Sequence, residues 1–236
     1  MLPDSAQLAE IVQTAAREEL LSRFTRVGFE IKADNSLVTE ADLALDKRLR
    51  ETLRQRWPDI AFLSEEMERS EQERLLGAGG PLWCLDPLDG TSNFAAGIPY
   101  FCVSLALLFE GRVVTGVIYD PLRQECFTAD AGRGALLNGK ALTVEPVALE
   151  LKRTVAVIDF KRLSKPLRKD LIEQMPFASQ RNFGSSALDW AWLAAGRGHT
   201  YLHGGQKLWD FSVGSLLFNE AGGQACTLEG RPVFKA

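Results

Sequence analysis

Hydrophobic positions along the chain follow two spacings. In residues 5–24 apolar side chains recur every three or four positions, which predicts an amphipathic helix. The same spacing predicts a second helix that opens at Thr39 and ends before Pro58. Residues 26–37 are more polar, so we expect a short hairpin or a loop there, centred on Ala33-Asp34-Asn35.

Short apolar runs dominate the next third of the chain. They predict strands at 60–63, 82–85, 101–109, 113–119, 125–128 and 135–137, with helix and loop at 67–80. The turns between the later strands are Glu110-Gly111, Asp120-Pro121 and Asn138-Gly139. Asn-Gly between two apolar runs is a strong hairpin signal.

From residue 154 onward strands and helices alternate. We expect strands at 154–158, 177–182 and 200–202, and helices at 165–174, 185–195 and 210–221. Alternation of this kind favours a layered α/β architecture. The pattern breaks around Pro146 to Lys152, so we predict one structural unit with two subdomains, residues 1–146 and 147–236.

Composition narrows the class of protein. The chain has 236 residues, 46% hydrophobic and 25% charged, with a net charge of −4 and a pI near 5.4. These values are typical of a globular protein and argue against a nucleic-acid or membrane-surface footprint. The four cysteines have no C-x-x-C spacing, and no signal peptide or apolar run of membrane-spanning length is present. We therefore expect a cytoplasmic protein.

The chemistry of the chain is concentrated in Pro81 to Phe94. An apolar run ends abruptly in Asp86, Pro87 fixes its own φ, and Asp89 and Gly90 follow. Carboxylates gather hard cations such as Mg²⁺, and the start of a helix offers N–H donors to an anion, so the stretch suits a metal-bridged phosphate. An ordinary Asp-Pro-Leu-Asp-Gly surface turn explains the same residues equally well.

Two other acidic positions also allow two interpretations. Thr39 and Asp42 match a capping box, worth ~1 kcal/mol, yet Asp42 could instead orient a catalytic hydroxyl. Glu65 and Glu66 follow an apolar strand, as Asp86 does, so one of them is expected to face inward rather than being a solvated pair.

Several catalytic schemes are not supported. Neither a phosphate-binding P-loop nor a dinucleotide motif follows a strand, and residues 86–90 fail the calcium-loop spacing. Only two histidines exist, with no nucleophile motif beside them. What remains is a set of carboxylates, each at the junction of an apolar segment with a helix start: Glu65, Asp86, Asp89 and Asp210.

Two sequence signatures make the chain similar to the inositol monophosphatase family. The first is Asp86-Pro-Leu-Asp-Gly-Thr-Ser-Asn-Phe94 with Gly97-Ile-Pro-Tyr-Phe101, and the second is Trp209-Asp-Phe-Ser-Val-Gly214 with Glu220-Ala-Gly-Gly223. Supporting matches are Leu37–Asp42, Ser64–Glu66, Gly132–Gly139 and Gly184–Leu188. The resemblance runs from about Lys32 to Val233.

The resemblance implies a five-layer αβαβα sandwich and Mg²⁺-dependent hydrolysis of phosphomonoesters. Two or three Mg²⁺ ions per site, inhibition by Li⁺ and a homodimer are usual in the family. Its metal ligands correspond to Glu65, Asp86, Asp89, Asp210 and the backbone carbonyl of Leu88. The amides of Gly90 and Thr91 would hold the phosphate, while Thr91 and Glu65 position the attacking water and Asp42 supports Thr91.

The substrate-contacting positions depart from the family. His199 and His203 stand where acidic residues are usual, and His203 takes the place of a glutamate that binds inositol hydroxyls. A histidine there could accept a hydroxyl hydrogen bond, favour a second anionic group if protonated, or make no contact at all. Arg181 and Ser185 match positions of the substrate pocket. Family members usually continue beyond the position of Ala236 with a strand and a helix, so we expect a last layer that is abbreviated or completed by a partner subunit.

The leading hypothesis is a phosphatase acting on a small phosphorylated polyol or sugar such as inositol 1-phosphate. A 3′(2′),5′-bisphosphate nucleotidase ranks second, because that branch carries Lys-Glu-Phe where this chain has Ser92-Asn93-Phe94. Fructose-1,6-bisphosphatase and histidinol-phosphatase activities stay open. The contrasting class is a non-catalytic regulatory partner protein.

Overall fold

A seven-stranded mixed sheet organises the first part of the chain. The computed structural model describes residues 2–24, 28–31, 37–145 and 150–233. The strand order is β3-β4-β5-β6-β7-β8-β9, with β3 and β4 parallel and the remaining pairs antiparallel. The strands are β3 (Ala61–Ser64), β4 (Leu82–Asp89), β5 (Cys102–Phe109), β6 (Arg112–Asp120), β7 (Glu125–Asp130), β8 (Gly134–Leu137) and β9 (Lys140–Ala141).

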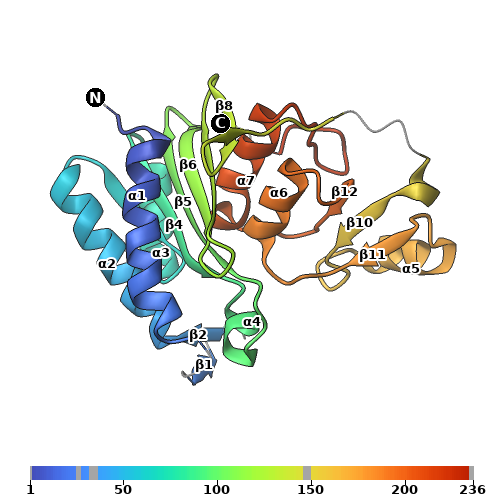
Figure 1. Cartoon of the computed structure of the whole chain (residues 1–236), viewed down its shortest axis with the longest axis horizontal. Coiled ribbons are helices and arrows are strands. Elements are labelled where there is room, and N and C mark those ends of the chain that lie inside the picture. The colour runs from blue at the N-terminus through green and yellow to red at the C-terminus, as the bar shows by residue number, and fades with distance from the viewer. Residues whose placement is uncertain (1, 25–27, 32–36, 146–149, 234–236) are drawn as a thin grey trace.

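Helices cover both faces of this sheet. α1 (Ser5–Ala16) and α2 (Glu40–Arg56) pack on one face, and α6 (Ser186–Ala194) and α7 (Leu208–Glu220) pack on the other (Figure 1). Because both faces are covered, β4 and β5 are almost continuously buried. The helices of the chain's last third therefore share a core with the strands of its first two thirds.

A second, three-stranded parallel sheet lies beyond α6 and α7. Its order is β11-β10-β12, formed by β11 (Ser179–Arg181), β10 (Val155–Ile158) and β12 (Thr200–Leu202). α5 (Lys165–Gln174) contributes apolar side chains to the small core on this sheet. The layers follow one another as helix, sheet, helix, sheet, helix (Figure 1), which confirms the expected αβαβα sandwich.

Most predicted elements form, with shifted ends. The helix expected over 5–24 is α1 followed by a π-helical turn, Arg17–Leu21. The polar section forms an antiparallel pair, β1 (Phe29–Ile31) with β2 (Leu37–Thr39), and the expected loop at Ala33-Asp34-Asn35 lies outside the described residues. The shorter helices are α3 (Arg69–Gly77), α4 (Thr91–Ala96) and a 3-10 turn, Leu151–Arg153.

The division into two subdomains stays a prediction. Residues 146–149, on which the boundary falls, lie outside the described part.

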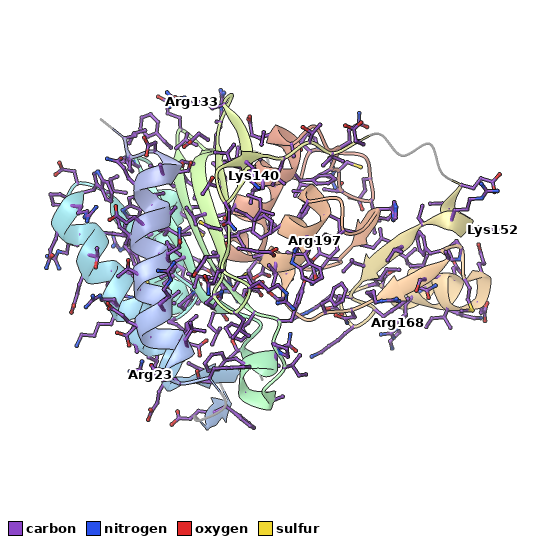
Figure 2. All side chains as sticks on the ribbon, viewed as in Figure 1. Arg23, Arg133, Lys140, Lys152, Arg168 and Arg197 are labelled. Atoms are coloured by element: carbon purple, nitrogen blue, oxygen red, sulfur yellow. The ribbon has the colours of Figure 1, made fainter. Side chains whose placement is uncertain are left out.

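None of the helices that the structure describes combines the length and apolar character needed to span a bilayer. Basic side chains are distributed widely: Arg23, Arg133 and Lys152 project from different sides of the molecule (Figure 2).

Candidate active site

Parallel pairing of β3 and β4 brings the first two carboxylates together. Ser64 pairs with Leu85, and the amide of Glu65 donates to the carbonyl of Leu85 over 3.1 Å. The pairing of β3 with β4 therefore ends at Ser64 and Leu85, and the next residue on each chain segment is an acid, Glu65 after β3 and Asp86 within β4. Both line one pocket, which has a cavity volume of about 190 Å³.

A β-bulge explains why Asp89 lines the same pocket as Asp86. Residues three apart on a regular strand point to opposite faces. Here Asp86 pairs with Ser104 and Asp89 with Cys102, so β4 advances by three residues while β5 advances by two. Pro87, which has no N–H to donate to a ladder, falls inside the bulge. The extra residue turns both aspartates toward the pocket.

Gly90 joins β4 to α4 in a conformation that suits glycine alone. Its φ is 96°, in the left-handed region. A Cβ at this position would lie 3.0 Å from the carbonyl oxygen of Tyr100 and 3.2 Å from the Cβ of Ser185. The missing side chain leaves the backbone of Gly90 and Thr91 directly on the pocket wall.

Asp42 caps α2 and also contacts Thr91; that the Thr91 hydroxyl is catalytic stays a prediction. Its Oδ2 accepts from the amide of Thr39 over 2.8 Å, which completes the capping box of α2. Its Oδ1 accepts from the hydroxyl of Thr91 over 3.2 Å, and that hydroxyl also lies 3.0 Å from the carbonyl of Leu88. Burial raises the pKa of Asp42 to about 6, against the lowering effect of the bonds from Thr39.

Asp89 fixes the start of α6. Its Oδ2 accepts from the hydroxyl of Ser185 over 2.7 Å and from the amide of Ala187 over 2.6 Å. A carboxylate is stabilised there by the unpaired N–H groups of the first turn. Burial nevertheless dominates and raises the pKa of Asp89. Ser185 lines the pocket, as predicted, with its hydroxyl engaged by Asp89.

Asp210 reaches the pocket from the first turn of α7. Its Oδ2 accepts from the amide of Lys207 over 2.7 Å. Burial and the nearby Asp89 raise the pKa of Asp210 to about 7. Asp86 is only 2% exposed, and burial followed by the charges of Glu65, Asp89 and Asp210 raises its pKa as well. The four carboxylates thus repel one another in a partly dehydrated space.

The second sheet supplies the opposite wall of the pocket. Asp159, Asn182 and His203 each follow one of its three strands. Ile158 pairs with Leu202 in parallel, so Asp159 and His203 leave the sheet side by side, with 3.5 Å between Asp159 Oδ2 and His203 Nε2. The further lining residues that sequence reasoning missed are Asp159, Arg162, Asn182, Ser186 and Asp189. Two of them, Asp159 and Asn182, directly follow an observed strand, and only Asp159 also follows the strand as predicted from the sequence.

Arg181 and His199 do not line this pocket. The guanidinium of Arg181 donates to the hydroxyl of Ser179 and to the carbonyl of Gln180, so the expected substrate contact of Arg181 is not seen. It ends the edge strand β11, one residue before the strand reaches the pocket at Asn182. The ring of His199 accepts from the amide of Val155 and thereby holds the second sheet together.

His203 lies in the pocket, as predicted. Burial is the largest influence on this ring and lowers its pKa, while Asp159 raises it and Arg162 lowers it further. A lowered pKa keeps the imidazole neutral near pH 7. The option of a protonated His203 that attracts an anion is therefore disfavoured.

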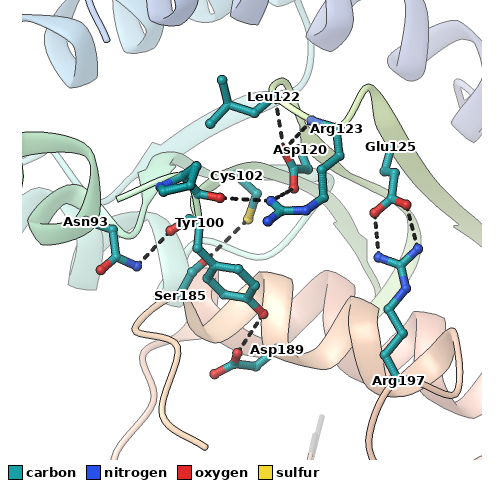
Figure 3. Close-up of polar contacts among 11 residues, drawn as sticks. Asn93, Tyr100, Cys102, Asp120, Leu122, Arg123, Glu125, Ser185, Asp189 and Arg197 are labelled. Atoms are coloured by element: carbon teal, nitrogen blue, oxygen red, sulfur yellow. Dashed lines mark hydrogen bonds and ion pairs between the residues drawn. The ribbon is translucent and has the colours of Figure 1, made fainter. Parts of the chain in front are cut away.

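A second polar network supports α6 behind the pocket (Figure 3). The hydroxyl of Tyr100 donates to Asp189 Oδ1 over 2.8 Å, and the amide of Asn93 donates to the carbonyls of Tyr100 and Phe183, each over 2.7 Å. Tyr100 lies between α4 and β5, so its bond to Asp189 ties this loop to α6, and the bond from Asn93 to Phe183 ties α4 to the residues before α6. The helix that carries Ser185 is thus tied to the loop that carries Thr91.

An αβαβα sandwich whose two sheets meet at a carboxylate-lined pocket defines a class of layered α/β proteins. The model of the inositol monophosphatase family matches residues 4–235. The chain belongs to the inositol monophosphatase family.

Relatives and solved structures support this assignment. The chain is 37% identical over 211 residues to Nus factor SuhB of Pasteurella multocida, covering 85% of this chain and 75% of that protein. Among solved structures, the suhB protein of Bartonella henselae is 31% identical with a TM-score of 0.83, covering 96% of this chain and 88% of that one. An IMPase of Thermotoga maritima is 29% identical with a TM-score of 0.82, covering 96% and 86%.

Proposed function

We propose that this protein is a Mg²⁺-dependent phosphomonoesterase that hydrolyses a small phosphorylated polyol or sugar. The observation that carries the proposal is the convergence of four carboxylates with Gly90 and Thr91, at the start of α4, in one pocket. Glu65 follows β3, Asp86 and Asp89 lie on β4, and Asp210 lies on α7. Burial raises the pKa of all three aspartates, so an uncompensated negative charge is disfavoured there.

The donor set fits Mg²⁺. Carboxylate and carbonyl oxygens are the ligands this ion prefers, and a divalent cation relieves the repulsion that raises the pKa of Asp86. In the described residues no three His, Cys, Asp or Glu side chains already stand at coordinating positions. The residues that would hold the metal are Glu65, Asp86, Asp89 and Asp210, with the carbonyl of Leu88. Bound there, Mg²⁺ supplies a more acidic water and offsets charge on the phosphoryl oxygens.

The chain's own groups then bind and orient the reactants. The amides of Gly90 and Thr91 would donate to phosphate oxygens; both residues line the pocket, which supports this role. The hydroxyl of Thr91 is held by Asp42 and by the carbonyl of Leu88, so its oxygen can accept a hydrogen bond from the attacking water. Glu65 would fix the other hydrogen of that water.

The test is phosphate release with Mg²⁺ from four compounds: inositol 1-phosphate, fructose 1,6-bisphosphate, 3′-phosphoadenosine 5′-phosphate and histidinol phosphate. We expect release from at least one, and loss of release when EDTA removes the metal. Asp86→Asn keeps the side-chain shape and is expected to lower kcat by at least about 100-fold, since removing even an outer-sphere partner of a metal ligand costs 10–100-fold.

Asp46→Asn is the matched control. Asp46 is also a buried aspartate, but it pairs with Arg50 on α2 and does not line the pocket. This variant should retain wild-type turnover. Release that is equal in wild type and Asp86→Asn would refute the carboxylate mechanism, and failure on all four compounds would refute the substrate class.

Solved structures of related proteins support more than one candidate substrate. Solved structures of the related SaIMPase-II, 25% identical to this chain, hold inositol monophosphate in one case and 2′AMP in another. They support a polyol phosphate as the first candidate and a nucleotide phosphate as the second. By family membership we also propose inhibition by Li⁺ and a homodimer, measured by Li⁺ titration of turnover and by light scattering.

A regulatory role is the second candidate function. It is favoured by the relatives named Nus factor SuhB, which include the Escherichia coli K12 protein at 37% identity over 200 residues. Replacing the chromosomal gene by the Asp86→Asn variant separates the two roles. A wild-type phenotype despite lost phosphatase activity would favour the binding role over catalysis.

A further inference from the structure

The pocket has two ends of different chemistry. The end built by the large sheet carries the four carboxylates, and the end built by the second sheet carries Asp159, Asn182 and His203. Arg162 also lies at this second end, in the loop that follows β10. Of all the described residues that line the pocket, Arg162 alone bears a permanent positive charge.

The backbone of Arg162 is held by contacts with its neighbours, whereas its side chain is available to bind a ligand. Its amide donates to the carbonyl of Asp159 over 3.1 Å. Gly204 packs so closely on its carbonyl that a Cβ on residue 204 would lie only 2.1 Å from that oxygen. The side chain itself is exposed, and its guanidinium has no hydrogen-bond or ion-pair partner among the residues that the structure describes.

Other arginines beside the pocket are fully engaged. Arg123 pairs with Asp120 at 2.8 Å and lies over the ring of Trp192, while Arg197 forms two bonds with Glu125 (Figure 3). These side chains hold the sheet against α6. Arg162 makes no such contact, although its charge acts on Asp210 and His203 and lowers the pKa of both.

The neighbours of Arg162 suit neutral groups rather than anions. The lowered pKa of His203 leaves a neutral ring, which can bond a hydroxyl. Asp159 Oδ1 accepts from the amide of Lys161 over 2.9 Å, and its Oδ2 faces His203. Asn182 can add a neutral donor, but among the described lining residues Arg162 alone can offset the charge of an anion at this end, and its planar guanidinium matches carboxylate and phosphate oxygens.

We propose that Arg162 binds a second anionic group of the substrate, so that the preferred substrate is a phosphomonoester bearing an additional phosphate or carboxylate. The proposal rests on the proposed phosphatase function, because it assumes that the phosphomonoester occupies the carboxylate end. The competing explanation is that Arg162 only balances the negative charge of the pocket.

Two matched substrate pairs separate these explanations. 2-Phosphoglycerate differs from glycerol 2-phosphate by a carboxylate in place of a hydroxymethyl group, and fructose 1,6-bisphosphate differs from fructose 1-phosphate by one phosphate. Wild type should prefer the doubly anionic member of at least one pair, and the pair that shows the preference identifies the anion. Arg162→Ala should lower kcat/KM for that compound by about 10–100-fold, mainly through KM, and change its partner less than about threefold.

Two variants control the experiment. Lys161→Ala removes a neighbouring exposed cation that does not line the pocket, so both members of each pair should react as in wild type. Arg162→Lys keeps the charge without the planar fork and should recover part of the preference. Equal losses for both members in Arg162→Ala, or no preference in wild type, would overturn the proposal.

Measuring ligand binding tests the anion site at Arg162 even if the protein shows no phosphatase activity. Should wild type hydrolyse neither these compounds nor inositol 1-phosphate, 3′-phosphoadenosine 5′-phosphate and histidinol phosphate, the phosphatase proposal is refuted. Titration calorimetry with the two matched pairs then measures binding directly. Tighter binding of a doubly anionic ligand that is lost in Arg162→Ala supports an anion site at Arg162. Equal binding by wild type and variant overturns it.

Discussion

The bond between Tyr100 and Asp189 allows a quantitative test of how α6 is held. Asp189 is 5% exposed, and the Tyr100 hydroxyl donates to its Oδ1 over 2.8 Å (Figure 3). Burial, followed by the charges of Asp89 and Asp159, raises the pKa of Asp189 well above 3.8, and the bond from Tyr100 lowers it. Tyr100→Phe removes that bond and leaves the rest of the ring in place.

The sign of the pH dependence follows from this raised pKa. The stability that Asp189 contributes is fully present below its unfolded pKa, near 3.8, and is lost as the pH rises through the higher folded value. Tyr100→Phe raises the folded pKa further, so its destabilisation grows with pH. A hydrogen bond to a charged group is worth about 1.5–3 kcal/mol and a neutral one about 1 kcal/mol. We expect a loss of about 1 kcal/mol at pH 4, where the raised pKa keeps Asp189 protonated, and a loss that grows to about 2 kcal/mol as Asp189 ionises at higher pH.

The assay is thermal unfolding in metal-free buffer over a series of pH values from about 4 to about 9. For a chain of this length 1 kcal/mol corresponds to about 2–4 °C, so the fall in Tm should be about 2–4 °C at pH 4 and about twice that once Asp189 is ionised. Asp189→Asn removes the titrating group, and in that background Tyr100→Phe should destabilise equally at all pH values. An equal effect of Tyr100→Phe across the whole series in the otherwise wild-type protein would refute the reasoning.

Two further substitutions test the site and its supporting loop. Thr91→Val removes the hydroxyl held by Asp42 and should lower kcat/KM by about 100-fold or more, whereas Thr91→Ser should stay within about tenfold of wild type; similar rates for the two variants would contradict a role for the hydroxyl. Gly204→Ala forces a Cβ against the carbonyl of Arg162 and should reduce stability by about 1–3 kcal/mol and weaken the preference for a second anion. Gly205→Ala is its control, because nothing lies within 4 Å of a Cβ there, and equal denaturant midpoints for the two alanine variants would contradict the steric argument.

The carboxylate end of the pocket could be predicted because its residues stand in short sequence patterns that can be recognised without knowing the strand pairing. Asp86 and Glu65 each follow an apolar strand, and Thr39 with Asp42 matches a helix start. The αβαβα order came from a family resemblance, and the structure and its neighbours confirm it. The bulge that turns Asp89 toward Asp86 was not predicted, since it depends on pairing with β5 rather than on the sequence of β4 alone.

The other end of the pocket could not be predicted because it depends on strand register. Arg181 was expected to contact substrate, but β11 reaches the pocket one residue later, at Asn182. Arg162 follows β10 by four residues, and its place at the pocket is set by Gly204, far along the chain. Neither the order β11-β10-β12 nor the contact between two loops leaves a pattern in the spacing of hydrophobic residues.

Folding and proposed chemistry use different oxygen atoms of the same acids. Asp42 caps α2 with Oδ2 and holds the Thr91 hydroxyl with Oδ1, while Asp210 caps α7 with Oδ2. Asp86 accepts from the amide of Leu88 with Oδ1, which supports the bulge. An asparagine keeps one oxygen for such a bond and loses the charge, whereas an alanine loses both. For Asp86 and Asp210, which each use one oxygen in such a bond, Asp→Asn therefore isolates the electrostatic contribution, and any additional loss in the Asp→Ala variant measures what that acid contributes to the fold. Asp42 accepts with both oxygens, so Asp42→Asn also loses one hydrogen bond.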